Sequence, residues 1–219
     1  MKKLFVASML ILFSIPSFSQ VYLSGKLVGA KQAINVASDW ADYTPPYHES
    51  HESFEASDMN FGAKIAIGTM VVKNVRAEIE YGYYSKFASS DTHWGSETTW
   101  WTGDTQINTF MVNAYYDFNN SSKFTPYVVA GIGMAKVKIS GKVPGVQDEA
   151  IPNGTTNNVA FNFGGGVGYS LTENITLDLG IKYNNFGEIK GTIDDGIGIG
   201  TGKHKYSNIE GSLGVRYTF

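Results

Sequence analysis

The chain alternates apolar and polar residues over most of its length, a two-residue period that predicts β-strands. The period is clearest at the C-terminus, where Val215, Tyr217 and Phe219 alternate with Arg216 and Thr218. No stretch after residue 20 shows the apolar period of a helix. The pattern predicts an all-β protein. Its eight strands are expected near residues 21–33, 58–70, 75–87, 104–118, 125–139, 158–171, 175–187 and 204–219.

The connections between these strands are alternately long and short. The long ones span 35–57, 88–103, 140–157 and 188–203, and the short ones span 71–74, 119–123 and 172–174. A meander in which every second turn is tight gathers the long connections at one end and the tight turns at the other. Because the strand number is even, both termini fall at the tight-turn end. Bacterial outer-membrane barrels have this layout, which predicts a closed eight-stranded antiparallel up-and-down transmembrane β-barrel.

The two faces of the predicted strands carry different residues. One face is apolar and holds no charged residue in seven strands, whereas the phase of the strand at 126–139 is ambiguous. The other face combines small or polar residues with five cations and five anions. A narrow lumen requires small side chains and paired charges, because an unpaired buried charge is costly. The predicted lumen charge network consists of Lys26, Lys64, Arg76, Glu78, Glu80, Asp117, Asp178, Lys182, Glu210 and Arg216.

The apolar face is predicted to contact lipid. Aromatic residues collect near both ends of the predicted strands, as expected of girdles at two water–lipid interfaces. The tight-turn girdle comprises Tyr116, Phe118, Tyr127, Tyr169, Tyr217 and Phe219, and the opposite girdle comprises Phe61, Tyr81, Tyr83, Phe110, Phe161 and Tyr183.

On the inner face, the last two predicted strands are neighbours. Their adjacency places Asp178 or Lys182 beside Arg216 or Glu210.

The N-terminus has the features of a secretory signal peptide. Two lysines precede an apolar stretch, and the small residues Ser17 and Ser19 precede a cleavage point before Gln20. The stretch is too short and wrongly flanked for a membrane anchor. The sequence therefore predicts a signal peptide at 1–19 and a single barrel domain at 20–219.

Composition narrows the possible functions. The chain contains no cysteine, which excludes disulfides, thiolate metal sites and a lipid-modified N-terminal cysteine. It is mildly acidic, with a formal net charge of −3, and has no basic run, so nothing supports nucleic-acid binding. No cofactor is expected.

Four stretches carry a resemblance to a known family: "TPYVVAGIG" (125–133), "FNFGGGVGYSL" (161–171), "ITLDLGIKY" (175–183) and "GVRYTF" (214–219). With the signal peptide, they resemble the small eight-stranded outer-membrane barrels, the OmpA/OmpX-like "outer membrane protein β-barrel domain" family. The resemblance covers residues 21–219.

The resemblance implies a place in the bacterial outer membrane, with the long connections outside the cell and both termini in the periplasm. It implies outer-membrane lipid and lipopolysaccharide as surroundings, and periplasmic chaperones and the barrel-assembly machinery as partners. In this family the terminal aromatic is read during assembly, which assigns that signal to Val215, Tyr217 and Phe219. A monomer is expected, with an extracellular ligand or host surface as a further partner.

Two long connections contain candidate sites. "HESHE" places His48 and His51 beside two glutamates, and histidine with carboxylate suits Zn²⁺ or Cu²⁺. The alternative is a solvated loop tip, because an unstructured loop holds no preset ligand geometry. Trp94, Trp100 and Trp101 form either a platform for a sugar or partner, or packing between connections at the headgroup level.

The leading functional hypothesis is a non-enzymatic outer-membrane barrel with a plugged lumen and long surface loops, in a structural or surface-interaction role. A narrow ion-conducting pore is the alternative, although eight strands leave an interior just wide enough for side chains. A lipid-modifying enzyme would need strand-borne catalytic residues. His204 and Ser207 are the nearest candidates, but their odd spacing puts them on opposite faces. A soluble lipocalin-like barrel, with its apolar face inside, is the remaining hypothesis.

Overall fold

The computed structural model describes residues 20–42, 44, 49–92, 99–142, 154–194 and 198–219. All regular secondary structure within these ranges is β-strand, and none of the described residues forms a helix able to cross a membrane. The strands are β1 (Val21–Asp42), β2 (Glu49–Val72), β3 (Val75–Tyr84), β4 (Phe87–Thr92), β5 (Thr99–Asp117), β6 (Phe124–Lys142), β7 (Gly154–Ser170), β8 (Ile175–Asp194) and β9 (Gly198–Thr218). The predicted signal peptide at 1–19 lies outside the described residues.

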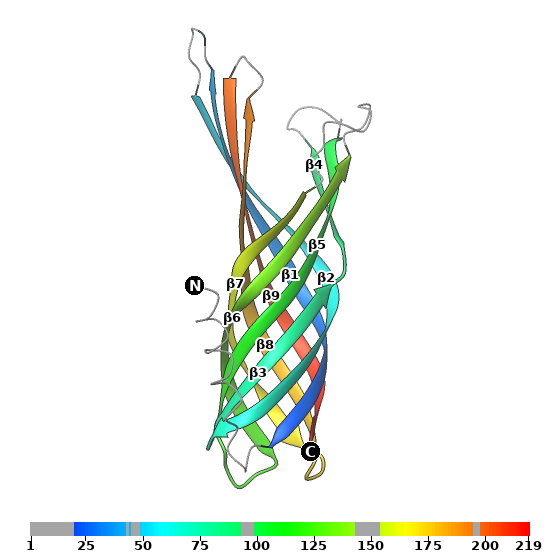
Figure 1. Cartoon of the computed structure of the whole chain (residues 1–219). Helices are drawn as coiled ribbons and strands as arrows, with labels where there is room; N and C mark the ends of the chain where they lie inside the picture. Colours follow the sequence, from blue (N-terminus) through cyan, green and yellow to red (C-terminus); the bar gives the residue numbers. More distant parts are fainter. Residues whose placement is uncertain (1–19, 43, 45–48, 93–98, 143–153, 195–197) are drawn as a thin grey trace.

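The strands close into one antiparallel barrel (Figure 1). β1 pairs with β9, and β3 pairs with β5 to complete the ring. β4 follows β3 after Ser85 and Lys86 and pairs with β5, so β3 and β4 form one wall of the barrel. The closed barrel therefore has eight strands, which confirms the predicted fold. At the C-terminus, the Phe219 amide donates to the Val21 carbonyl oxygen at 3.0 Å, beside the start of β1.

The apolar face points outward, so the lipocalin-like hypothesis is wrong. Large apolar side chains on every wall of the barrel are about half exposed or more, including Leu27 at 70%, Ile65 at 66% and Leu213 at 59%. In a closed barrel these outward apolar side chains form an exposed band. The band requires an apolar solvent, because contact between apolar surface and water is unfavourable.

The structure fixes the phase of β6, which the sequence left open. Tyr127 and Val129 are buried in the interior, whereas Val128 and Ile132 are exposed on the outer wall. Tyr127 was expected in the tight-turn girdle, and that assignment is wrong. Its ring packs edge-on against Tyr115 inside the barrel, with centroids 5.5 Å apart.

The strands extend further than predicted at the end opposite the tight turns. The structure corrects the long connections expected at 35–57, 88–103, 140–157 and 188–203, because the described parts of these ranges are largely strand. Beyond the apolar band both faces of a sheet meet water, so the alternation that marks a strand in the sequence fades.

Two separate sheets project from this end. Pairing between β2 and β3 ends at Gly62 and Tyr84, and pairing between β7 and β8 ends at Phe161 and Asn185. Beyond these points β2, β1, β9 and β8 continue as one sheet, the first blade. β4, β5, β6 and β7 continue as another, the second blade. Figure 1 shows the two blades diverging from the barrel.

Candidate functional site

Charged side chains from β1, β2, β3, β8 and β9 lie buried or nearly buried in the middle of the barrel interior. The period of two places them on the inner face, opposite the exposed apolar residues. We call them the central charge cluster, which consists of Lys26, Lys64, Glu78, Glu80, Lys182 and Glu210. Glu80 and Glu210 are completely buried.

Glu80 is the centre of this cluster. Its carboxylate lies 2.8 Å from Lys26 Nζ, 3.1 Å from Lys182 Nζ and 3.5 Å from Lys64 Nζ. Glu210 also contacts two of these lysines, with Lys64 Nζ at 2.5 Å and Lys182 Nζ at 3.8 Å. Buried carboxylates of this kind persist because each is matched by cations at hydrogen-bond distance.

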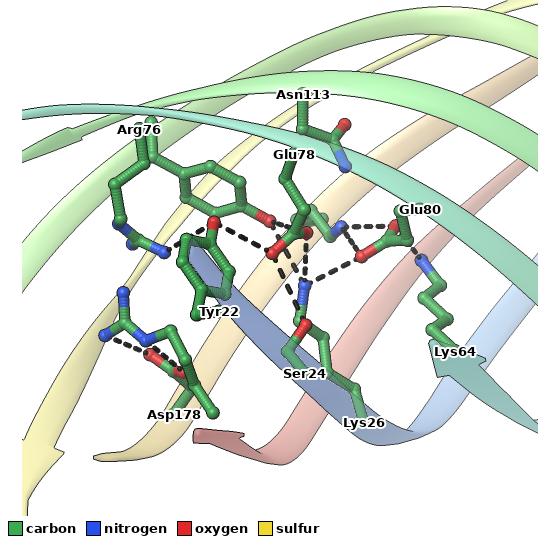
Figure 2. Close-up of polar contacts among 12 residues, drawn as sticks. Tyr22, Ser24, Lys26, Lys64, Arg76, Glu78, Glu80, Asn113 and Asp178 are labelled. Atoms are coloured by element: carbon green, nitrogen blue, oxygen red, sulfur yellow. Dashed lines mark hydrogen bonds and ion pairs between the residues drawn. The ribbon is translucent and has the colours of Figure 1, made fainter. Parts of the chain in front are cut away.

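Glu78 connects the cluster to neutral donors from other strands (Figure 2). Lys26 Nζ and the Tyr115 hydroxyl each donate to Glu78 Oε1 at 2.8 Å. The hydroxyls of Tyr22 and Ser24 donate to Glu78 Oε2, at 3.2 and 3.4 Å. These bonds satisfy both oxygens of the carboxylate in an interior that water reaches poorly.

Two arginine–aspartate pairs lie nearer the tight turns. Arg76 holds Asp117 with two bonds, Nε to Oδ2 at 2.7 Å and Nη2 to Oδ1 at 2.9 Å. Arg216 is 3.4 Å from Asp178, a longer and less directional contact. The Tyr22 ring contacts both guanidinium groups, with its centroid 5.6 Å from Arg76 Cζ and 5.4 Å from Arg216 Cζ.

The structure thus brings all ten residues of the predicted charge network into the interior. Lys182 reaches Glu210 and Arg216 reaches Asp178, two of the neighbour pairs that strand adjacency suggested. Lys182 also reaches Glu80 across the lumen. Five cations face five anions, so the interior carries no net charge from these groups.

Five amide side chains from five strands of the barrel lie next to the central charge cluster, and one of them, Asn113, is directly opposite Glu78 in the β3–β5 pairing. Asn162 Nδ2 donates to Asn113 Oδ1 at 2.9 Å, and Asn184 Nδ2 donates to Asn208 Oδ1 at 2.7 Å. Asn208 Nδ2 in turn donates to Gln32 Oε1 at 3.2 Å. All five side chains are buried. Sequence reasoning placed Asn113 and Asn162 on the inner face but missed Gln32, Asn184 and Asn208, although the two-residue period places these on the same face.

A cluster of buried apolar side chains lies in the interior at the blade end, and we call it the mouth cluster. Sequence reasoning missed it, because the inner face was assigned charged, small or polar residues and no large apolar ones. At its centre the rings of Tyr84 and Phe186 meet edge-on, with centroids 5.6 Å apart. The mouth cluster consists of Val28, Ala30, Ile34, Tyr84, Phe87, Ile107, Met111, Ala135, Val137, Ala160, Phe186 and Tyr206.

The candidate metal and catalytic residues do not form a site in the described part of the chain. His51 lies on β2, where its Nδ1 is 2.6 Å from Asp39 Oδ1 on the neighbouring β1, and His48 lies outside the described residues. Among the described residues, no group of three or more metal-ligating side chains comes together. His204 and Ser207 fall at positions of opposite parity on β9, as their spacing predicted.

The tryptophans predicted as a platform or as packing between connections fall outside the described side chains. Trp94 lies outside the described residues, and the side chains of Trp100 and Trp101 on β5 are not described.

The comparisons with known proteins agree with this architecture. The outer membrane protein beta-barrel domain family matches residues 5–219. The chain belongs to this family. The solved outer-membrane barrels that resemble it include neisserial surface protein A, with a TM-score of 0.52 and 19% identity over 87% of this chain and 97% of that one. OprG of Pseudomonas aeruginosa also has a TM-score of 0.52, with 13% identity over 89% of this chain and 96% of that one.

Sequence relatives are also outer-membrane proteins. The outer membrane protein PagN of Salmonella typhimurium is 43% identical over 86 residues, which cover 38% of this chain and 36% of PagN. The opacity protein opA67 of Neisseria gonorrhoeae is 29% identical over 132 residues, which cover 49% of this chain and 52% of that protein. The matches therefore span about a third to a half of these relatives.

Proposed function

We propose that this outer-membrane barrel has a closed lumen and acts as a surface-interaction protein, presenting its two blades outside the cell. The observation that carries the proposal is that two buried clusters, the central charge cluster and the mouth cluster, lie in the interior and join opposite walls. With the lumen closed, the blades are the part of the barrel available to a partner.

Contacts between opposite walls support the closed lumen. β3 and β8 lie on opposite sides of the eight-stranded ring. Side chains from these two walls nevertheless meet at two levels, Glu80 with Lys182 at 3.1 Å and Tyr84 with Phe186 at 5.6 Å between ring centroids. An ion would have to displace both contacts, one of them between buried charges and the other between apolar rings.

The same interior argues against catalysis. Its buried acids and bases are held in ion pairs, and the one strand-borne serine–histidine candidate is split between two faces. We therefore propose a non-enzymatic role.

The exposed apolar band on the outer wall is proposed to contact outer-membrane lipid and lipopolysaccharide, and the barrel to insert as a monomer.

Assembly and orientation complete the proposal. Val215, Tyr217 and Phe219 form the terminal signal for the assembly machinery, delivered with periplasmic chaperones. Both termini and the tight turns face the periplasm, and the blades face outward. Protease treatment of intact cells should then cut within the ranges 35–57, 88–103, 140–157 or 188–203 and spare the tight turns. Cleavage confined to the tight turns would reverse the orientation.

Conductance in planar bilayers tests the closed lumen. The refolded barrel should give no steady open-channel current, whereas an ion-conducting pore would give one. A double variant, Tyr84→Ala with Glu80→Ala, serves as the positive control because it removes one partner from each contact between β3 and β8. Steady conductance by the unmodified barrel would overturn the closed-lumen proposal.

A further inference from the structure

The first blade has an open edge on β2. Among the described residues, the last backbone–backbone hydrogen bond between this strand and the β3 wall runs from the Ser85 amide to the Phe61 carbonyl oxygen, at 2.7 Å. On its other side β2 remains paired with β1 as far as Glu49 and Ala41. Among the described residues, the stretch 49–57 of β2 therefore has a neighbouring strand on one side.

The direction of the backbone groups along this edge follows from the ends of the same strand. The Met70 amide donates toward the β1 side, to Gln20, whereas the Phe61 carbonyl accepts from the β3 side. In an antiparallel pair, successive residues direct their N–H and C=O groups to alternate sides. Since the β1–β2 register is unbroken, odd-numbered residues such as Ser53 and Glu55 direct theirs to the open side.

Such an edge is a template for another strand. The charge of this β2 edge determines which kind of strand can bind to it. The stretch "ESHESFEASD" (49–58) contains four acidic residues and no lysine or arginine. The side chains of Glu49, Glu55 and Asp58 are exposed. Two copies of this edge would bring like charges together, which disfavours pairing with itself and favours a basic partner.

The free edge of β7 provides an internal comparison. Beyond Phe161 it is also paired on one side, with β6, but its stretch "GTTNNVA" (154–160) carries no charge. The acidic character is therefore a property of the β2 edge rather than of every blade edge.

We propose that residues 49–57 of β2 dock an extended, basic polypeptide segment as an added strand of the first blade. Backbone hydrogen bonds from the odd-numbered residues supply the pairing, and the acidic side chains select the partner. This proposal rests on the proposed surface-interaction function. It adds the chemistry of the partner that binds at one edge of the first blade.

The test uses the full barrel refolded in lipid nanodiscs and a fluorescent peptide of alternating lysine and threonine. We expect saturable binding that weakens as salt is raised, and no binding of the matched peptide in which glutamate replaces lysine. Replacing Glu49 and Glu55 by Gln and Asp58 by Asn should weaken binding by about tenfold, since each exposed charge pair contributes modestly.

Proline variants separate strand addition from simple charge attraction. Ser53→Pro removes an amide from the open side of β2 and leaves the acids in place, and an edge strand tolerates it. It should abolish peptide binding. The matched control is Asn157→Pro, whose amide lies on the open side of β7, and it should bind the peptide normally. Heat-modifiable gel mobility checks that both variants retain the barrel.

Equal binding by Ser53→Pro and Asn157→Pro, or equal binding of the acidic and basic peptides, would overturn the proposal. So would the absence of any peptide binding. If one of these negative binding results is obtained with a barrel that is non-conducting and whose blades are cleaved on intact cells, the docking proposal is refuted and the proposed function still stands. Steady conductance would instead refute the closed lumen whatever the peptide result.

Discussion

Tyr84 and Phe186 meet edge-on inside the barrel, 5.6 Å between ring centroids, although their strands stand on opposite walls. Each side chain is almost completely buried. Aromatic pairs in this geometry are favourable beyond the burial of their area. The contact therefore ties the β3 and β8 walls together at the blade end, where the two sheets begin to separate.

Removing either ring should loosen this end of the barrel. Tyr84→Ala and Phe186→Ala should each lower the free energy of unfolding by about 3–5 kcal/mol, as for other buried aromatics. The double variant should lose less than the sum, since both changes delete the same contact. Urea unfolding followed by tryptophan fluorescence measures all three.

The matched control is Tyr81→Ala on the same strand, whose side chain is exposed on the outer wall. It should change the unfolding midpoint much less than Tyr84→Ala does. Additive losses in the double variant would mean that the two rings act independently.

Glu80 should be the most sensitive acid in the interior, because three lysines share its carboxylate. Glu80→Ala leaves those cations short of a counter-charge and should cost on the order of 3–5 kcal/mol. Glu80→Gln, which keeps the volume, should cost nearly as much if charge rather than packing is lost. Ile79→Ala, on the outer wall, is the control. A Glu80→Gln barrel as stable as the original would contradict this account of the cluster.

The strand period made the inner charges predictable, but it works only where one face is apolar. β6 shows one limit: Gly131 and Gly133 face inward beside outward Ile132 and Met134, so small and apolar residues occupy both faces. The sequence there offers no polar residue to mark the lumen. Only pairing with β5 and β7 fixes the phase.

A bulge in β8 shows a second limit. The register with β9 shifts between Asn185 and Glu188, and Gly187 has a φ of 80°, which side-chain-bearing residues rarely adopt. Just beyond this point the odd-numbered Ile189 turns inward and packs against the mouth cluster. Counting alternate residues from the tight turn therefore assigns Ile189 to the outer face. The bulge that causes this error is defined by the pairing of β8 with β9.

The two arginine–aspartate pairs should differ in strength. Arg76 binds Asp117 with two short bonds, whereas Arg216 lies 3.4 Å from Asp178. Arg76→Ala should cost about 3–5 kcal/mol as a broken buried pair. Arg216→Ala should cost roughly 1–2 kcal/mol, the value of a weaker charged hydrogen bond. Val215→Ala on the lipid face is the control, and a larger loss for Arg216→Ala than for Arg76→Ala would reverse the ranking.

The first blade should become less protected in acid. A hydrogen bond from His51 lowers the pKa of the Asp39 carboxyl below its usual range, aided by the charges of His51 and Lys203. A carboxyl with a lowered pKa stabilises the folded hairpin at pH values above about 4, the unfolded value, and this contribution is lost as the pH falls through the folded pKa. Hydrogen exchange of 36–42 and 49–55 should report it.

Asp39→Asn is the matched variant. It should abolish the extra pH dependence of exchange in this hairpin and leave exchange in the barrel wall unchanged. The same acid-induced change in the Asp39→Asn protein would assign the effect to other carboxylates.

The terminal aromatic should matter more for assembly than for stability. Phe219 is 69% exposed on the outer wall, and its ring meets Tyr217 edge-on at 5.1 Å. Phe219→Ala removes one outer-wall anchor, a loss of about 2 kcal/mol by area, which a closed barrel should tolerate after refolding in detergent. In cells, a chain ending at Thr218 should instead accumulate in the periplasm, measured by fractionation and heat-modifiable mobility. Val128→Ala, on the outer wall but away from the terminus, should assemble normally. Equal assembly of the truncated and full-length chains would remove Phe219 from the proposed signal.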